Sequence, residues 1–202
     1  MKVAVFGASG RAGSEITKEL AARGHEVVAI ARKPEAIGPM PGVTAEAGDA
    51  SDPAALAVLI AGCDAVISAL HFNVSAETLL SALRKAGVGR LLVTGGAASL
   101  EVAPGKRLID TPAFPEAAKP IALGGIIFLE DIRKETAIDW TFFSPAAVIF
   151  QGPRLGHFRT GQDRLIVDDA GQSRISFADY AIAMVDELEQ HRHSRSRFTA
   201  AY

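Results

Sequence analysis

The most constraining feature of this sequence is a glycine-rich turn that lies between an apolar strand and a helix near its start. Residues 1–6 predict a short buried strand, and residues 11–23 carry a helical pattern. Between them, starting at Gly7, three glycines follow the spacing G-x-x-G-x-x-G, and a second apolar strand is expected at residues 26–31. Such a unit is typical of a site where backbone N–H groups at a helix N-terminus hold a pyrophosphate.

Each glycine of this turn has a separate expected role. Gly7 allows the tight turn, Gly10 lets the backbone approach the phosphates, and Gly13 lets the helix pack closely on the strand. The spacing alone is a weak signal, because glycine-rich turns are common. The strand before the motif and the helix after it are the context that makes the motif specific. A tight turn without a ligand is the alternative.

The end of the second strand favours NADP(H) over NAD(H). The usual pattern has an acidic residue there, which binds the adenosine ribose. This sequence has Arg32 and Lys33 instead. A guanidinium attracts a 2′-phosphate and forms bidentate hydrogen bonds with it, so NADP(H) is the expected cofactor, with NAD(H) possible. Arg11 would add a second positive charge. The alternative is that Arg32 is only a solvated charge at the end of a strand.

Composition narrows the class of protein further. The 202 residues fit one NAD(P)-binding domain, residues 1–202, in which residues 145–202 add elements on the substrate side. A net charge of −2 gives no general attraction to nucleic acid or to anionic membranes. No apolar run approaches the roughly 18 residues of a membrane span. One cysteine, Cys63, excludes an internal disulfide. We therefore expect a cytoplasmic protein without a nucleic-acid or membrane partner.

Helical and strand patterns alternate along the first 150 residues. This alternation predicts an α/β fold, a Rossmann-like doubly wound parallel sheet with helices on both faces and a small C-terminal extension. Further strands are expected at residues 43–47, 65–69, 91–94 and 140–144, and further helices at residues 53–60, 75–85 and 121–136.

The remaining segments are expected to be less regular. Residues 104–120 are rich in proline and predict an irregular loop over the active face. Residues 165–171 suggest a short hairpin, residues 176–189 a helix, and residues 198–200 a last short strand. Ligands of such sheets bind beyond the carboxyl ends of the strands. That rule gathers residues 7–13, Arg32, Asp49, residues 69–71, residues 94–96 and residues 145–146 around one crevice.

A common catalytic pair of this fold is missing. Ordinary carbonyl reduction uses a tyrosine as the acid with a lysine four residues later. Tyr180 is followed four residues later by Met184, and Tyr202 is the last residue. Oxidised flavins and quinones accept a hydride without a positioned acid, because their reduced anions take protons from water. The sequence therefore predicts an NAD(P)H-dependent oxidoreductase that reduces a flavin or a quinone directly, without a metal. The flavin would be a substrate or loosely bound.

Only weak candidates for catalytic residues are present. His71 follows the fourth strand, and histidine suits proton transfer near neutral pH. A loop histidine that makes one hydrogen bond is the alternative for this residue. Thr94 ends the fifth strand, and Lys119 lies in the proline-rich loop. Ser68 and Ser144 are further possible helpers at strand ends.

Several segments resemble a known family. Residues 7–13 followed by residues 23–27 resemble the atypical short-chain dehydrogenase/reductases with an NAD(P)H-binding domain. Residues 139–146, 173–181 and 197–199 resemble the NADH-flavin reductase subgroup in particular, and the resemblance covers essentially the full chain. This group is related to biliverdin reductase and flavin reductase. It is also related to NmrA-like regulators, which bind the dinucleotide without turning it over.

The resemblance implies a place for each part of the cofactor. The residues are Ser9, Gly10, Arg11 and Ala12 for the pyrophosphate, Asp49 and Ala50 for the adenine, Ala69 and Leu70 for the ribose, and Thr94, Gly95, Pro145 and Ala146 for the nicotinamide. Relatives often carry an aromatic residue where this chain has residues 115–119. The alanines there argue against a stacking or acid role for that segment.

Two other functions remain open from the sequence. Because no catalytic residue can be assigned, the main alternative is a non-catalytic NADP(H)-sensing regulatory protein that binds a partner. An isomerase or epimerase of a nucleotide sugar is less favoured, because that chemistry normally needs the missing tyrosine and lysine. For the oxidoreductase, the expected partner is a small-molecule acceptor, and a homodimer is possible.

Overall fold

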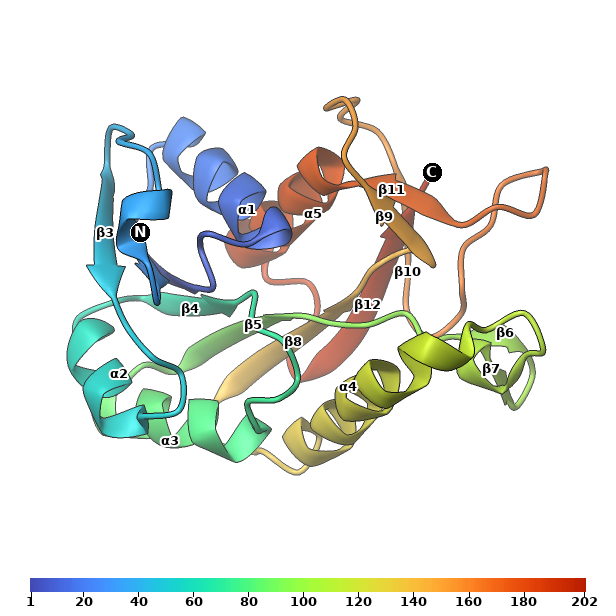
Figure 1. Cartoon of the computed structure of the whole chain (residues 1–202), viewed down its shortest axis with the longest axis horizontal. Helices are drawn as coiled ribbons and strands as arrows, with labels where there is room; N and C mark the ends of the chain where they lie inside the picture. The colour runs from blue at the N-terminus through green and yellow to red at the C-terminus, as the bar shows by residue number, and fades with distance from the viewer.

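The centre of the molecule is an eight-stranded sheet (Figure 1). The computed structural model describes residues 1–202. In chain order the strands of this sheet are β1 (Lys2–Phe6), β2 (Glu26–Ala31), β3 (Val43–Ala47), β4 (Ala65–Ser68), β5 (Arg90–Thr94), β8 (Asp139–Ser144), β10 (Arg159–Gly161) and β12 (Ser196–Ala201).

The strand order confirms the predicted doubly wound, Rossmann-like fold. Across the sheet the order is β10-β12-β8-β5-β4-β1-β2-β3. Neighbouring strands pair in parallel except at the edge, where β10 is antiparallel to β12. The chain starts in the middle of the sheet at β1, moves out to β3, and returns to β4 on the other side of β1. The order therefore reverses beside β1, which is where ligands of such sheets bind.

Helices cover both faces of the sheet, as predicted (Figure 1). On one face lie α1 (Arg11–Ala22) and α5 (Phe177–Gln190), which pack against each other. On the other face lie α2 (Pro53–Leu59), α3 (Ala76–Ala86) and α4 (Lys119–Ile132). Each face buries its own apolar cluster of 22 residues. The central strands are therefore apolar on both sides, which explains their continuous rather than alternating hydrophobic pattern.

The prediction of an irregular loop at residues 104–120 is partly wrong. The segment includes β7 (Lys106–Arg107), which pairs antiparallel with β6 (Glu101–Ala103). Short helical turns follow at η2 (Leu108–Asp110) and η3 (Glu116–Ala118), and one more lies earlier, at η1 (Pro34–Ala36). Helix α4 then begins at Lys119, two residues earlier than expected, with Pro120 in its first turn. Proline is tolerated there because the first N–H groups of a helix lack intrahelical partners.

The predicted hairpin at residues 165–171 is wrong, although its turn exists. Asp168 accepts hydrogen bonds from the N–H groups of Ala170 and Gln172, which closes the turn. The chain after the turn forms β11 (Arg174–Ser176), whose partner is β9 (Val148–Phe150), and the two are parallel. The turn is local and visible in the sequence, whereas the partner strand lies more than 20 residues away.

The last strand is longer than expected and belongs to the main sheet. β12 pairs in parallel with β8 and antiparallel with β10, so the C-terminal segment widens the Rossmann sheet. Phe143 of β8 stacks between Tyr180 and Phe198, with centroid separations of 4.1 Å to each ring.

None of the helices combines the length and the apolar character that crossing a membrane requires.

Candidate functional site

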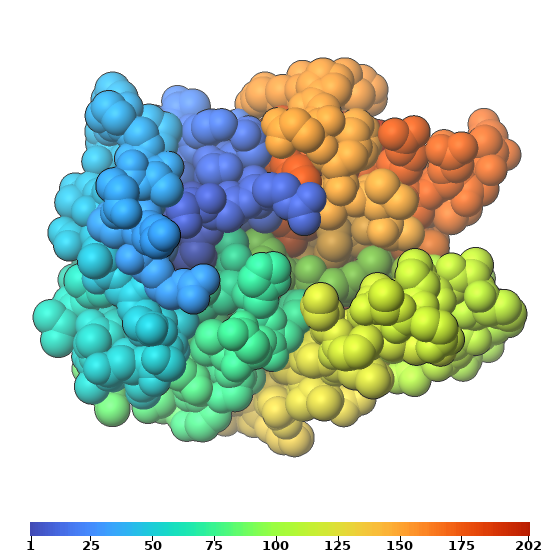
Figure 2. Space-filling view, in the orientation of Figure 1, coloured from blue at the N-terminus to red at the C-terminus, as the bar shows by residue number.

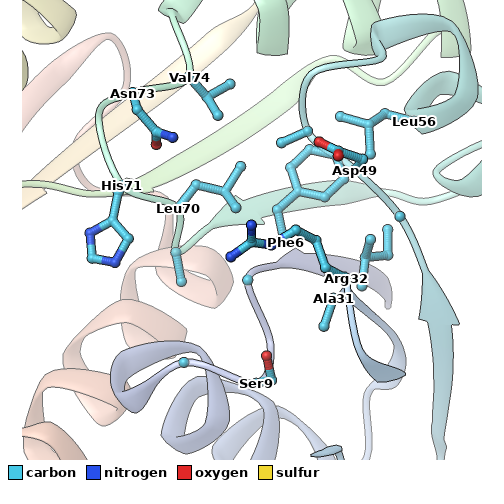
Figure 3. Close-up of a pocket in the computed structure, with 16 residues that line it drawn as sticks. Phe6, Ser9, Ala31, Arg32, Asp49, Leu56, Leu70, His71, Asn73 and Val74 are labelled. Carbon is cyan, nitrogen blue, oxygen red and sulfur yellow. The ribbon is translucent and has the colours of Figure 1, made fainter. Parts of the chain in front are cut away.

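A cavity of about 250 Å³ opens at the carboxyl ends of β1, β2, β3 and β4 (Figure 3). In the space-filling view the surface is hollowed between the blue N-terminal segment and the green segment below it (Figure 2). The lining residues come from the ends of four strands, from the loops that follow them and from helix α2: Phe6, Gly7, Ser9, Gly10, Ile30, Ala31, Arg32, Gly48, Asp49, Ala50, Leu56, Ala69, Leu70, His71, Asn73 and Val74. The site therefore lies at the reversal of strand order beside β1.

The glycine turn is held by hydrogen bonds to the neighbouring strand. The N–H groups of Gly7 and Ala8 both donate to the carbonyl oxygen of Ile30, at 2.9 and 3.2 Å. The N–H of Gly10 donates to the carbonyl oxygen of Gly7 at 2.9 Å. Gly7 has a φ of +74°, which favours glycine. The turn is thus fixed in place relative to the end of β2.

Close packing at two positions of the turn excludes any side chain. A Cβ atom on Gly7 would lie 2.7 Å from the carbonyl oxygen of Ala69. A Cβ atom on Gly13 would lie only 2.1 Å from the carbonyl oxygen of Gly7. Both neighbours are backbone atoms, which cannot rotate away. The first turn of α1 therefore crosses the glycine turn at a distance that only glycine permits.

The start of α1 presents free hydrogen-bond donors. The N–H groups of Ser9, Arg11, Ala12 and Gly13 have no hydrogen-bond partner within the protein. Residue Gly10 caps the helix and has no side chain to accept these bonds, and no acidic residue lies in the first turn. These donors and the positive end of the helix dipole suit a bound anion.

Arg32 brings a free positive charge to the same cavity. It follows the last residue of β2, is exposed, and lines the cavity. Its guanidinium projects into the cavity (Figure 3) and forms no ion pair or hydrogen bond within the protein. By contrast, Arg23 at the end of α1 contacts three carboxylates. Lys33 does not line the cavity. Arg32 is therefore available to an anionic group of a ligand.

Asp49 lies on the far side of the cavity and is held by its neighbour. Its Oδ1 atom accepts the N–H of Ser51 at 2.9 Å and the Ser51 hydroxyl at 2.8 Å. These hydrogen bonds, and to a smaller extent the charge of Arg32, lower the pKa of the Asp49 carboxyl below its usual value. The carboxylate is thus ionised and fixed, and its Oδ2 atom is free to accept a hydrogen bond from a ligand.

The expected nicotinamide residues lie outside this cavity. Thr94 and Gly95 stand at the carboxyl end of β5, and Pro145 and Ala146 follow β8. The N–H of Gly95 donates to the carbonyl oxygen of Phe143 at 2.8 Å, which ties these two strand ends together. Strands β5 and β8 follow β4 in the sheet, so these residues continue the row of strand ends away from β1 and β2.

Two charged residues that the sequence suggested for the site, Arg11 and Lys119, do not line the cavity. The guanidinium of Arg11 lies over the ring of Phe177, at 5.4 Å from its centre, and does not join Arg32 in the cavity. Lys119 forms an ion pair with Glu116 at 2.5 Å in the first turn of α4, outside the cavity. Among the weak catalytic candidates, only His71 lines the cavity.

Neither tyrosine is available as an acid. The hydroxyl of Tyr180 is buried and donates to the carbonyl oxygen of Phe143 at 2.9 Å, and burial raises its pKa well above the usual value. The hydroxyl of Tyr202 donates to Asp179 at 2.6 Å and accepts the N–H of Ser176. Both hydroxyls hold parts of the fold together.

Several lining residues were not singled out from the sequence. They are Phe6, Ile30, Ala31, Gly48, Leu56, Asn73 and Val74. Three of them, Phe6, Ile30 and Ala31, lie at the carboxyl ends of apolar strands. The expectation that ligands bind beyond these strand ends therefore points to them. Leu56 belongs to α2, and Asn73 and Val74 belong to the loop after β4. These three are brought to the cavity by tertiary packing, for which the local sequence has no signal.

Comparisons with known proteins agree with this geometry. The sequence model of a family described as NAD(P)H-binding matches residues 7–188. A solved structure from Burkholderia pseudomallei, named "putative exported protein", is 48% identical over the whole of both chains, with a TM-score of 0.91. A structure from Bacteroides thetaiotaomicron, named "putative epimerase", is 42% identical, with a TM-score of 0.94 over all of this chain and 96% of the other.

A third solved structure has a name that states a redox activity. It comes from Streptococcus pneumoniae TIGR4 and is named "putative NADH-flavin reductase". It is 35% identical to this chain, with a TM-score of 0.84 over all of this chain and 99% of the other. The three names differ, whereas the fold and the length of the proteins agree. The likeness therefore extends over the whole fold.

Proposed function

The chain belongs to the NAD(P)H-binding family, and from this premise we propose that it is an NADPH-dependent oxidoreductase that transfers a hydride directly to a flavin or a quinone. The observation that carries the proposal is the unpaired guanidinium of Arg32 in a cavity lined by Ser9 and Gly10 of the glycine turn, beside the free N–H groups at the start of α1. A backbone anion site beside a free cation matches a dinucleotide with an additional phosphate on its ribose.

The residues present fit NADPH part by part. The free N–H groups of Ser9, Arg11, Ala12 and Gly13 would hold the pyrophosphate. Arg32 would hold the 2′-phosphate. The adenine would lie between Leu70 and the segment of Asp49 and Ala50. When bound, NADPH supplies the hydride. The chain binds the cofactor, orients it along the strand ends and excludes competing reactions.

The state of the tyrosines supports a flavin or a quinone as the acceptor. Both tyrosine hydroxyls are engaged within the fold, and Lys119 is paired with Glu116. A reaction that needs a positioned acid therefore has no supplier among these residues. A flavin or a quinone avoids this need, because its reduced anion takes its proton from water. The name of the Streptococcus pneumoniae neighbour agrees with a flavin as acceptor.

A second candidate rests on the same engaged tyrosines. A protein that binds NADP(H) and signals its redox state to a partner needs the cavity but no catalytic acid. The Bacteroides thetaiotaomicron neighbour is named as an epimerase, and this activity is less compatible with the residues of this chain. Epimerisation of a nucleotide sugar normally uses a free tyrosine acid with a lysine. Tyr180 here is buried and hydrogen-bonded to the backbone.

The experiment that tests the proposal is a turnover assay. NADPH oxidation is followed by the loss of the reduced cofactor's near-ultraviolet absorbance, with FMN or a simple quinone as acceptor and with NADH run in parallel. We expect turnover that saturates in both substrates and is faster at low NADPH than at equal NADH. If the protein binds NADPH but oxidises it no faster than buffer does, the oxidoreductase is excluded, and the sensor becomes the better account.

A further inference from the structure

The loop after β4 presents alternating apolar and polar side chains. Leu70, Phe72 and Val74 pack against the apolar cluster beneath α2, α3 and α4. His71 and Asn73 lie between them in the sequence, and both are exposed and line the cavity. The Asn73 side chain makes no hydrogen bond within the protein. The loop therefore holds an unpaired amide at the edge of the cavity.

The position of this amide is fixed by Phe72. The Phe72 ring packs against the rings of Phe128 and Phe142, at centroid distances of 5.5 and 6.1 Å. Two adjacent glycines of α4 leave room for it. A Cβ atom on Gly125 would lie 2.8 Å from the Phe72 ring, and one on Gly124 would lie 3.2 Å from the Phe72 Cβ atom. Because Phe72 is held in this way, its neighbour Asn73 has a defined place at the cavity rim.

The part of the cavity beside Asn73 suits a flat base. Asn73 and Val74 lie on one side, and Asp49 and Leu56 lie on the other (Figure 3). Leu70, Val74 and Leu56 offer apolar walls, and the polar groups of Asn73 and Asp49 stand at the edges. Apolar walls with a few placed polar groups are what binding sites for planar heterocycles show.

We propose that Asn73 is a specificity residue that recognises the adenine base of the dinucleotide. This inference rests on the proposed cofactor. The Asn73 amide would donate to N7 of adenine and accept from its 6-amino group, a bidentate pairing that suits an amide and adenine. Hypoxanthine carries a carbonyl in place of the 6-amino group, so Asn73 can form only one of the two bonds with it. The chain thereby selects the adenine dinucleotide over its deaminated analogue.

The test compares NADPH with its hypoxanthine analogue by direct titration. Wild-type protein is expected to bind NADPH roughly tenfold more tightly than the analogue, because a bidentate base contact is strongly discriminating. In Asn73→Ala the affinity for NADPH should fall by about that factor, while the affinity for the analogue changes little. Asn73→Asp keeps the size of the side chain and the acceptor for the 6-amino group but removes the donor to N7. It should therefore show an intermediate loss.

Two outcomes would overturn the proposal, and they are distinguishable. If Asn73→Ala weakens NADPH and the analogue equally, or leaves both unchanged, Asn73 does not recognise the base, while the cofactor site itself stands. If the wild-type protein binds neither dinucleotide, the proposed function fails and this inference fails with it. Circular dichroism spectra and unfolding midpoints of the variants show whether each is folded as the wild type is.

Discussion

Replacing Gly13 with alanine is expected to lower the affinity for NADPH by at least about 100-fold. The new Cβ atom would lie 2.1 Å from the carbonyl oxygen and 2.8 Å from the carbonyl carbon of Gly7. The helix α1 must then move away from the turn, and its free N–H groups move with it. Hydrogen bonds to a charged group contribute about 1.5–3 kcal/mol each, so losing two of them gives a loss of this size. The measurement is a calorimetric titration with NADPH.

The same substitution is also expected to destabilise the fold. Overpacking of a tight contact costs about 1–3 kcal/mol, which a shift of the urea midpoint measures. Gly38→Ala is the matched control, because its Cβ atom would have no neighbour within 4 Å and the residue has no positive φ. We expect Gly38→Ala to bind and unfold as the wild type does. A folded Gly13→Ala protein that binds NADPH within about twofold of the wild type would show that the turn does not hold the cofactor.

Replacing Arg32 with alanine is expected to remove the preference for NADPH. The guanidinium lies free in the cavity and would contact only the 2′-phosphate, a group that NADH lacks. A charge-assisted hydrogen-bonded contact contributes on the order of 1–3 kcal/mol. NADPH affinity should therefore fall by about 10- to 100-fold, and NADH affinity should stay nearly unchanged. Titrations of the wild type and the variant with both cofactors measure this difference.

Lys33→Ala is the control for Arg32→Ala. Lys33 is the next residue and carries the same charge, but it does not line the cavity. Its loss should change the affinities for both cofactors little. The preference of the wild type should also weaken as salt is added, because Arg32 is exposed and its charge is screened. Equal losses for NADPH and NADH in Arg32→Ala would contradict the assignment of the 2′-phosphate to this residue.

The sequence predicts the part of the site that is formed by residues close together in the chain. The strand, the glycine turn and the following helix are contiguous, so the requirement for glycine at Gly7 and Gly13 is visible as spacing. Arg32 is found by the same route, because it directly follows the strand to which the turn is hydrogen-bonded. The doubly wound parallel sheet was predicted as well, because helices connecting parallel strands constrain how the sheet can be wound.

The features that depend on contacts between distant segments of the chain could not be predicted from the sequence. Asn73 is one exposed residue in a loop, and its place at the cavity depends on Phe72 packing beside Gly125 of α4, about 50 residues away. The strand β11 likewise pairs with β9 rather than with the segment just before its turn. Arg11 and Phe177 meet only because α1 and α5 share one face of the sheet. A single sequence carries no signal for such pairings.

We propose above all that the cavity beside β1 holds NADP(H) with its 2′-phosphate on Arg32. The most direct measurement is a crystal structure of the protein grown with NADP⁺. We predict the pyrophosphate within hydrogen-bond distance of the free N–H groups at the start of α1, those of Ser9, Arg11, Ala12 and Gly13. We predict the 2′-phosphate on the guanidinium of Arg32. A dinucleotide bound with its pyrophosphate away from the glycine turn, or with Arg32 turned into solvent, would contradict the account.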